Sequence, residues 1–219
     1  MDSNSPLKCG YVAIVGRPNV GKSSLLNRIL GQKLSITSRK PQTTRHQLLG
    51  IKTKGHVQAL YVDTPGLHKS ARKAINRYMN RAASSVITDV DVVLMVVDRL
   101  KWVDDDEVVL KYVRDSQAPT FLVINKVDLL DDKTRLLPHL DFARTKMSFE
   151  EMIPISALSG HNVDELEQLL ASYLPTGPHF FPGDQLTDRN DRFIATEIIR
   201  EKITRQLGDE LPYEIAVQV

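Results

Sequence analysis

Cysteine is almost absent from this chain, which contains one, Cys9, among 219 residues. A single thiol cannot close an internal disulfide, so the fold needs no oxidising compartment. Long hydrophobic runs are also absent: the longest covers residues 92–97, whereas a membrane-spanning helix needs about 20 apolar residues. The first ten residues contain no apolar run of the signal-peptide type. We therefore expect a soluble, globular protein located in the cytoplasm.

Acidic residues are scarce in one part of the chain. Between Arg28 and Arg81 there are twelve lysines and arginines and a single acid, Asp63, whereas residues 176–219 carry five basic and eight acidic side chains. A one-sided basic block is typical of proteins that contact an anionic partner such as nucleic acid or anionic lipid. Solvated surface lysines and arginines would give the same pattern, so the composition alone leaves both interpretations open.

Short apolar runs that are typical of β-strands alternate with segments whose apolar residues have helical spacing. Asn162 and Glu165 have the spacing of a helix-capping box, and residues 54–56 have the composition of a hairpin turn. The alternation predicts an α/β fold with a mostly parallel six-stranded sheet flanked by helices. Strands are expected at residues 11–15, 47–53, 57–63, 92–97, 120–124 and 152–155, and helices at 23–30, 75–86, 104–114 and 162–174.

Proline and glycine cluster at residues 175–183, which predicts a domain boundary. We expect a first domain at residues 1–175, a linker at 176–183 and a shorter second unit at 184–219. In that unit, residues 192–207 have helical spacing and residues 213–219 alternate as a strand would. One helix and one strand bury each other's apolar faces poorly, so the second unit is expected to be incomplete.

Residues 16–23 read Gly-Arg-Pro-Asn-Val-Gly-Lys-Ser, which matches the P-loop pattern G-x-x-x-x-G-K-[ST]. The segment lies between a predicted strand and a predicted helix, which is the context that this motif requires. Its glycines allow backbone N–H groups to surround phosphate oxygens, and the helix N-terminus adds a favourable dipole. Lys22 is expected to reach the β- and γ-phosphates, and the Ser23 hydroxyl to bind Mg²⁺. A turn that fits the pattern by chance is the alternative, which the flanking elements disfavour.

Asn125, Lys126 and Asp128 form an Asn-Lys-x-Asp sequence at the end of the predicted strand 120–124. That end lies at the edge of a parallel sheet where ligands bind. The Asp128 carboxylate can accept hydrogen bonds from N1–H and the 2-amino group of guanine, whereas adenine has an acceptor at N1 and no 2-amino group. Because lost hydrogen bonds to a charged group cost about 1.5–3 kcal/mol each, the sequence predicts selectivity for guanine nucleotides. Ser156 and Ala157 follow the last predicted strand and could supply a backbone N–H to guanine O6.

Two further segments are placed to sense a γ-phosphate. Asp63 ends the strand 57–63 and begins the sequence Asp-Thr-Pro-Gly66, in which the acid can hold Mg²⁺ through water and the Gly66 N–H can meet the phosphate. The loop before residue 47 contains Thr43 and Thr44, and either hydroxyl could complete the Mg²⁺ coordination, with Thr44 favoured. Taken alone, these threonines would indicate only a polar loop. Both segments lie in the basic block, so their rearrangement after hydrolysis could couple the nucleotide to RNA or protein contacts.

The order of these motifs resembles that of the translation-factor-related P-loop GTPases. Within that class, the segments GRPNVGKSSLLN, SRKPQTTRH, YVDTPGLH, NKVD and ISA resemble the bacterial Era family, and the tail resembles the first helix and first strand of that family's C-terminal KH domain. The resemblance implies a GTPase that uses GTP, GDP and Mg²⁺, assists 30S ribosomal subunit assembly and contacts the 3′ end of 16S rRNA. It also leaves open a peripheral association with the inner membrane.

The motifs and the resemblance together imply one nucleotide site. Its catalytic residues are expected to be Lys22, Asn19, Gly66 and Thr44, and its metal ligands Ser23, Thr44 and Asp63. The residues expected to contact the nucleotide are Gly16, Arg17, Pro18, Asn19, Val20, Gly21, Lys22, Ser23, Ser24, Thr43, Thr44, Asp63, Thr64, Pro65, Gly66, Asn125, Lys126, Asp128, Ser156 and Ala157.

Turnover and RNA binding are expected to be limited by two departures from related proteins. Ras-like enzymes have a glutamine where this chain has Leu67, so slow intrinsic hydrolysis is expected. Spacing alone does not assign an arginine that would stabilise the transition state; Arg17 and Arg45 are the candidates. Related GTPases with asparagine at the position of Asn19 recruit K⁺ beside the phosphates, which predicts stimulation by K⁺.

KH domains hold RNA with a G-x-x-G loop, which the second unit lacks up to Val219. The chain as given is therefore expected to bind guanine nucleotide without high-affinity, sequence-specific RNA binding.

Two other functions remain open at this point. The missing glutamine also agrees with a scaffold in which the nucleotide only stabilises an RNA- or protein-docking module. An ATP-using P-loop kinase, or a GTPase of the tRNA-modification or double-GTPase branches, is a third class. Asp128 disfavours ATP, the single P-loop disfavours a double GTPase, and the KH-like tail disfavours the tRNA-modification enzyme. A hydrolysing GTP switch is the function that we favour.

Overall fold

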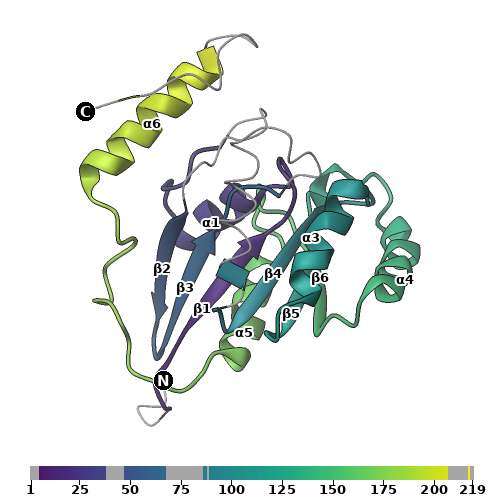
Figure 1. Ribbon diagram of the computed structural model, residues 1–219, viewed down its shortest axis with the longest axis horizontal. Coiled ribbons are helices and arrows are strands. Elements are labelled where there is room, and N and C mark those ends of the chain that lie inside the picture. The colour runs from purple at the N-terminus through teal and green to yellow at the C-terminus, as the bar shows by residue number, and fades with distance from the viewer. Residues whose placement is uncertain (1–4, 38–46, 68–85, 88, 207–216, 218–219) are drawn as a thin grey trace.

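The computed structural model describes residues 5–37, 47–67, 86, 87, 89–206 and 217. A six-stranded sheet forms its centre, with the strand order β2-β3-β1-β4-β5-β6 (Figure 1). Only the β2–β3 pair is antiparallel, which confirms the predicted hairpin and the mostly parallel sheet. The strands are β1 (Lys8–Val15), β2 (Leu48–Lys54), β3 (Val57–Asp63), β4 (Val92–Asp98), β5 (Thr120–Asn125) and β6 (Glu151–Pro154).

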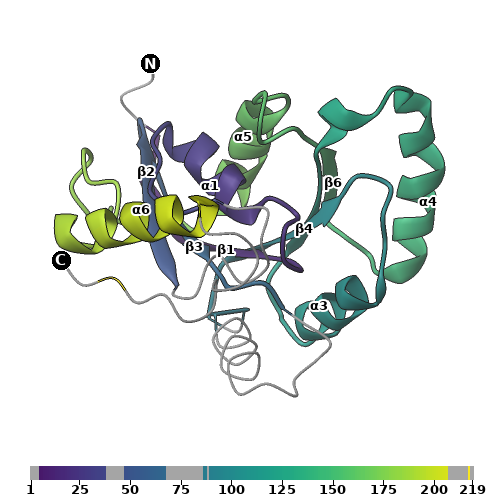
Figure 2. The ribbon, with the colours of Figure 1, turned by 90° about the horizontal axis from the view of Figure 1, so that it is seen from above.

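Helices cover both faces of this sheet. The view from above shows α1 and α5 on one face and α3 on the other, with α4 beyond the β6 edge (Figure 2). The central strands contribute apolar side chains to both faces: Val12 and Ile14 of β1 pack toward α1 and α5, and Ala13 and Val15 pack toward α3. This two-sided burial explains why the central strands are continuous apolar runs. The helices are α1 (Lys22–Leu30), α3 (Asp104–Arg114), α4 (Leu136–Lys146), α5 (Val163–Tyr173) and α6 (Asp191–Gln206), with two 3₁₀ turns, η1 (Val127–Leu129) and η2 (Lys133–Arg135).

Two details of the sequence prediction are wrong, and one helix was missed. The first strand begins at Lys8, three residues before the apolar run, because its first residues pair with β3. Asn162 does not form a capping box: its backbone is left-handed, with φ 56°, and its Nδ2 donates to the carbonyl of Pro154 at 2.9 Å. The missed helix is α4, whose sequence has no regular apolar stripe.

Some predicted elements lie outside the described residues. Of the helix expected at residues 75–86, only Val86 is described, and it is helical together with Ile87. Of the strand expected at residues 213–219, only residue 217 is described. The division into domains at residues 175 and 183 stays a prediction.

Residues 176–187 run along the sheet rather than hanging free of it. Thr176 and Thr187 form isolated β-bridges with Lys8 and Gly50, and the N–H of Ile51 on the β2 edge donates to the carbonyl of Leu186 at 2.8 Å. Figure 1 shows this segment passing beside β2 on its way to α6. It therefore shields the outer edge of the sheet, which would otherwise be open to pairing with another chain.

Helix α6 packs at the end of the sheet where β2 begins (Figures 1 and 2). Phe193 and Ile194 contact the core between the sheet, α1 and α5. Glu201 is fully buried, and its carboxylate lies 2.6 Å from the Lys33 ammonium in the segment after α1. The helix is thus attached by both apolar and charged contacts. Among the described residues, no helix has both the length and the apolar character needed to cross a membrane.

Candidate nucleotide-binding site

The P-loop sequence forms the turn between β1 and α1, at the carboxyl end of the central strand. Gly21 adopts a φ of 104°, and a Cβ atom added there would lie 2.2 Å from Nδ2 of Asn125. A Cβ atom at Gly16 would lie 2.5 Å from the carbonyl oxygen of Val96 on β4. Both glycines are therefore required by close approaches to neighbouring strands, and the loop has a fixed shape.

Lys22 is the first residue of α1 and is buried in the P-loop. Its Nζ donates to the carbonyl oxygens of Gly16 and Arg17, each at 3.0 Å. Burial lowers the pKa of this ammonium to about 8. The P-loop backbone thus surrounds a lysine whose charge is poorly compensated.

Arg17 is tied to α3. Its guanidinium Nε lies 3.1 Å from Oδ2 of Asp106, and the same carboxylate oxygen accepts from the N–H of Val103 at 3.0 Å. Asp106 is fully buried, and burial raises the pKa of its carboxyl group. This ion pair engages Nε of Arg17 and holds the side chain against α3.

The predicted Asp-Thr-Pro-Gly sequence follows β3 and meets the P-loop. Asp63 is fully buried, and its Oδ2 accepts from the Ser23 hydroxyl at 2.7 Å. Burial raises the pKa of this carboxyl group. The Thr64 hydroxyl donates to the carbonyl of Ile14 at 2.9 Å, which joins the ends of β3 and β1. A Cβ atom at Gly66 would lie 2.7 Å from the backbone nitrogen of Pro18, so the two loops are in contact.

Asn125 joins three loops at the end of β5. Its Nδ2 donates to the carbonyl of Val20 in the P-loop at 2.9 Å. Its Oδ1 accepts from the N–H of Lys126 at 2.8 Å and from the N–H of Ala157 at 2.9 Å. One carboxamide therefore brings the P-loop, the Asn-Lys-x-Asp segment and the Ser-Ala segment together.

Lys126 connects the same loops by its side chain. Its backbone is left-handed, with φ 66°, and its Nζ donates to the carbonyl of Asn19 and to Oδ2 of Asp98, each at 2.7 Å. Asp98 ends β4 and was not predicted as a site residue. An acid at the carboxyl end of a buried strand, next to the strand that ends in Asn125, was the signal that could have identified it.

The remaining predicted base contacts are less fixed. Asp128 is exposed and is the middle residue of η1, the 3₁₀ turn that begins directly after Lys126. The N–H of Ser156 donates to the carbonyl of His161 at 3.1 Å, and the N–H of Ala157 is used by Asn125. A contact from these amides to guanine O6 stays a prediction, and it would require one of them to be shared.

Three predicted residues fall outside the described part of the chain: Thr43, Thr44 and Arg45. Leu67, at the position of the missing glutamine, is fully buried in the core on the α3 side of the sheet, and its N–H donates to the carbonyl of Gly16 at 3.3 Å. Leu67 therefore has a packing role. Asn19 has a left-handed φ of 64°, and the K⁺ expectation attached to it stays a prediction.

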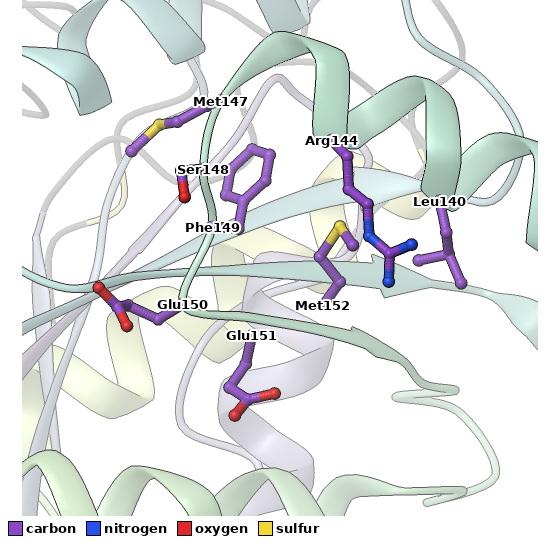
Figure 3. A pocket seen from close by; sticks show the side chains of 8 residues that line it. All are labelled: Leu140, Arg144, Met147, Ser148, Phe149, Glu150, Glu151 and Met152. Carbon is purple, nitrogen blue, oxygen red and sulfur yellow. The ribbon is translucent and has the colours of Figure 1, made fainter.

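A separate groove lies beside the start of β6. Leu140 and Arg144 come from α4, and the other side chains come from residues 147–150, which lead into β6, and from the first two residues of β6, as Figure 3 shows. Because parallel strands begin at the edge opposite the P-loop, this groove is distinct from the nucleotide site. It is lined by Leu140, Arg144, Met147, Ser148, Phe149, Glu150, Glu151 and Met152.

Comparisons with known proteins agree with this geometry. A family model described as "50S ribosome-binding GTPase" matches residues 11–126. The GTPase Era of Azotobacter vinelandii is 61% identical over all 219 residues, and that of Pseudomonas putida is 60% identical. The chain belongs to the Era family of GTPases. It covers 73% of each of these two relatives.

Solved Era structures share this fold. A crystal structure of Era in complex with MgGDPNP and nucleotides 1506–1542 of 16S ribosomal RNA superposes with a TM-score of 0.92 and 40% identity, covering 97% of this chain and 72% of that one. A variant of Aquifex aeolicus Era bound to GDP and AlF4⁻ gives the same TM-score with 39% identity and the same coverage. The predicted Era resemblance and the P-loop GTPase fold are thereby confirmed.

Proposed function

We propose that this Era-family chain binds and hydrolyses GTP as a switch in 30S ribosomal subunit assembly, with 16S rRNA as its RNA partner. The observation that carries the proposal is the junction at Asn125, where the P-loop, Asn-Lys-x-Asp and Ser-Ala segments share one side chain. The Era structure with MgGDPNP and 16S rRNA supports both the nucleotide and the RNA. The proposal places the protein in the cytoplasm, where ribosomal subunits assemble.

The triphosphate would lie along the P-loop backbone. Residues 16–24 would supply backbone N–H groups and the N-terminus of α1, both of which favour anions. Lys22 is buried and bonded only to neutral carbonyls, so an anionic phosphate oxygen would be a stronger partner for its ammonium. The Gly66 N–H would face the γ-phosphate from the other side, and K⁺ beside Asn19 would add positive charge there.

The donors at the end of β3 fit a magnesium ion. Asp63 is fully buried, and its Oδ1 has no hydrogen-bond partner among the described residues, while Oδ2 accepts from Ser23. A buried carboxylate oxygen without a partner costs free energy that a cation would offset. Carboxylate and hydroxyl oxygens are also the ligands that Mg²⁺ prefers. Ser23 and Asp63 would hold the ion with Thr44 or Thr43, and bound Mg²⁺ would neutralise charge on the β- and γ-phosphates.

The purine would be selected beside Lys126, which is already held between Asn19 and Asp98. Asp128 would accept from the guanine N1–H and 2-amino groups. An Asp128→Asn variant replaces one acceptor by a donor, which suits xanthine. We expect GDP binding to weaken by about 100-fold or more, and XDP binding to appear.

The test compares GDP, ADP and XDP titrations of the wild-type chain, Asp128→Asn and a control, Asp131→Asn, which changes another exposed acid nearby. The control should keep wild-type preferences. Equal binding of GDP and ADP by the wild-type chain would overturn the proposal. Single-turnover assays with 30S subunits complete the test. A hydrolysing switch should cleave GTP as the wild-type protein and XTP as the Asp128→Asn variant, whereas a docking scaffold should cleave neither.

A further inference from the structure

Asn27 on α1 fixes the backbone of the segment that follows this helix. Its Oδ1 accepts from the N–H groups of Leu34 at 2.9 Å and Ser35 at 2.8 Å, and its Nδ2 donates to the carbonyl of Ser35 at 2.7 Å. Leu34 and Ile36 on either side of Ser35 are buried in addition. Three hydrogen bonds from one carboxamide, together with two buried neighbours, set both the position and the orientation of Ser35.

The Ser35 side chain is directed at the proposed metal ligand. Its hydroxyl donates to Oδ2 of Asp63 at 2.8 Å, and Ser35 is only 4% exposed. The same oxygen accepts from Ser23 at 2.7 Å, so two hydroxyls hold Oδ2, while the buried Oδ1 has no hydrogen-bond partner in the part of the chain that the structure describes. The carboxylate is thereby fixed by residues from α1 and from the segment after it, neither of which is adjacent to β3 in sequence.

We propose that Ser35 is a positioning residue for the magnesium site and acts through Asp63, with Asn27 holding Ser35 in place. A hydrogen bond to one carboxylate oxygen restricts rotation of the group and orients the other oxygen, as outer hydrogen bonds do in other metal sites. The proposal rests on the Mg²⁺ site of the proposed function. It assigns a role to Ser35, which lies outside the quoted motif segments, and to Asn27, which ends the segment GRPNVGKSSLLN and had no role there.

The experiment measures the dissociation rate of a fluorescent GDP analogue as free Mg²⁺ is varied, starting from excess EDTA. In Ser35→Ala, the Mg²⁺ concentration that gives half of the slowing should rise by about 10–100-fold, the usual effect of losing such a partner. Rates in EDTA should stay within about twofold of wild type, because Ser35 does not touch the nucleotide in this proposal. Ser35→Thr, which keeps the hydroxyl, should restore most of the Mg²⁺ affinity.

Two further variants separate positioning from general stability. Asn27→Ala should also raise the Mg²⁺ midpoint, and the Asn27→Ala/Ser35→Ala double variant should be no worse than Ser35→Ala, because both changes act through one hydrogen bond. Ser116→Ala is the matched control: its hydroxyl donates to the carbonyl of Ile87 at 3.1 Å, away from the site, and its loss should leave the midpoint unchanged.

An unchanged Mg²⁺ midpoint in Ser35→Ala, with normal Mg²⁺ dependence in the wild-type chain, would overturn the inference alone. Faster release to the same extent with and without Mg²⁺ would also overturn it, since that result indicates a structural role. A wild-type chain that binds GDP without any effect of Mg²⁺ would instead overturn the magnesium site of the proposed function, and the inference with it.

Discussion

Among the described residues, the hydrogen-bond partners of the buried Lys22 ammonium are the neutral carbonyls of Gly16 and Arg17. The cost of this arrangement is visible in a pKa that burial lowers to about 8. In the unfolded chain the same group titrates near its ordinary value of 10.5. Between these pH values Lys22 binds more protons in the unfolded chain than in the folded one, so its contribution to the free energy of unfolding increases with pH in this window.

We therefore expect the nucleotide-free chain to gain about 2 kcal/mol of stability from Lys22 between pH 7.5 and 9.5. Lys22→Met should lack this gain, and Lys111→Met, which changes an exposed lysine on α3, should keep it. Urea unfolding at several pH values measures the difference. The range stays below pH 10 because burial raises the pKa of Tyr61, whose phenol opposes the trend at higher pH. Parallel pH profiles for the wild type and Lys22→Met would contradict the prediction.

The motif residues of the site could be predicted from the sequence, but their supporting residues could not. Lys22 and Asp63 are recognisable because phosphate and metal chemistry fixes residue type and spacing within a short segment. Ser35 and Asp98 act through hydrogen bonds to residues 28 positions away in sequence. Asp98 at least ends a buried apolar strand, which is a weak local signal, whereas nothing local distinguishes Ser35 from an ordinary polar residue. The hydrogen bonds that give both residues their roles are visible only in the folded chain.

The elements follow the same division between strong local signals and tertiary effects. The buried central strands were predicted within one or two residues at most ends, because two-sided burial requires continuous apolar runs. Helix α4 was missed because Leu137 and Phe142 are exposed and Pro138 interrupts the pattern. Pro138 lies in the first turn, where a backbone N–H has no partner within the helix, so the proline is tolerated.

The predicted linker is held by a buried side chain on β3. Gln58 is fully buried, and its Oε1 accepts from the N–H groups of Phe180 at 2.8 Å and Phe181 at 3.0 Å. Its Nε2 donates to the carbonyl of Phe181 and to the hydroxyl of Thr53, both at 2.9 Å. The Gln58 side chain thus forms, with the backbone of residues 180 and 181, hydrogen bonds of the kind that a neighbouring strand would form. These bonds fix the path of the chain toward α6.

Gln58→Ala should release this segment. We expect a loss of about 1–3 kcal/mol of stability, from partners that lose their hydrogen bonds, and faster hydrogen exchange at the amides of Phe180 and Phe181. Gln168→Ala is the matched control, because Gln168 is exposed on α5 and its loss should change stability by less than about 0.5 kcal/mol. Unchanged exchange at Phe180 and Phe181 in Gln58→Ala would show that the β-bridges alone hold the segment.

At the scale of the whole molecule, helix α6 contacts the segment that leads into the loop expected to sense the γ-phosphate. Glu201 of α6 lies 2.6 Å from the Lys33 ammonium, and the Thr37 hydroxyl lies 3.4 Å from its other carboxylate oxygen. Thr37 directly precedes residues 38–46, which contain Thr43 and Thr44. Thr37, which contacts α6, is thus adjacent in sequence to the segment that contains both candidate magnesium ligands.

The Lys33–Glu201 pair should contribute more than an ordinary surface ion pair. Glu201 is fully buried, so its carboxylate depends on protein partners, whereas Arg144 and Asp141 on α4 form an exposed pair. A double-mutant cycle with Lys33→Gln and Glu201→Gln, read from hydrogen exchange of α6 amides, should give a coupling energy above about 1 kcal/mol. The same cycle on the exposed pair, read from α4 amides, should give less than about 0.5 kcal/mol. Equal coupling in the two cycles would mean that the Lys33–Glu201 pair holds α6 no more strongly than an exposed ion pair does.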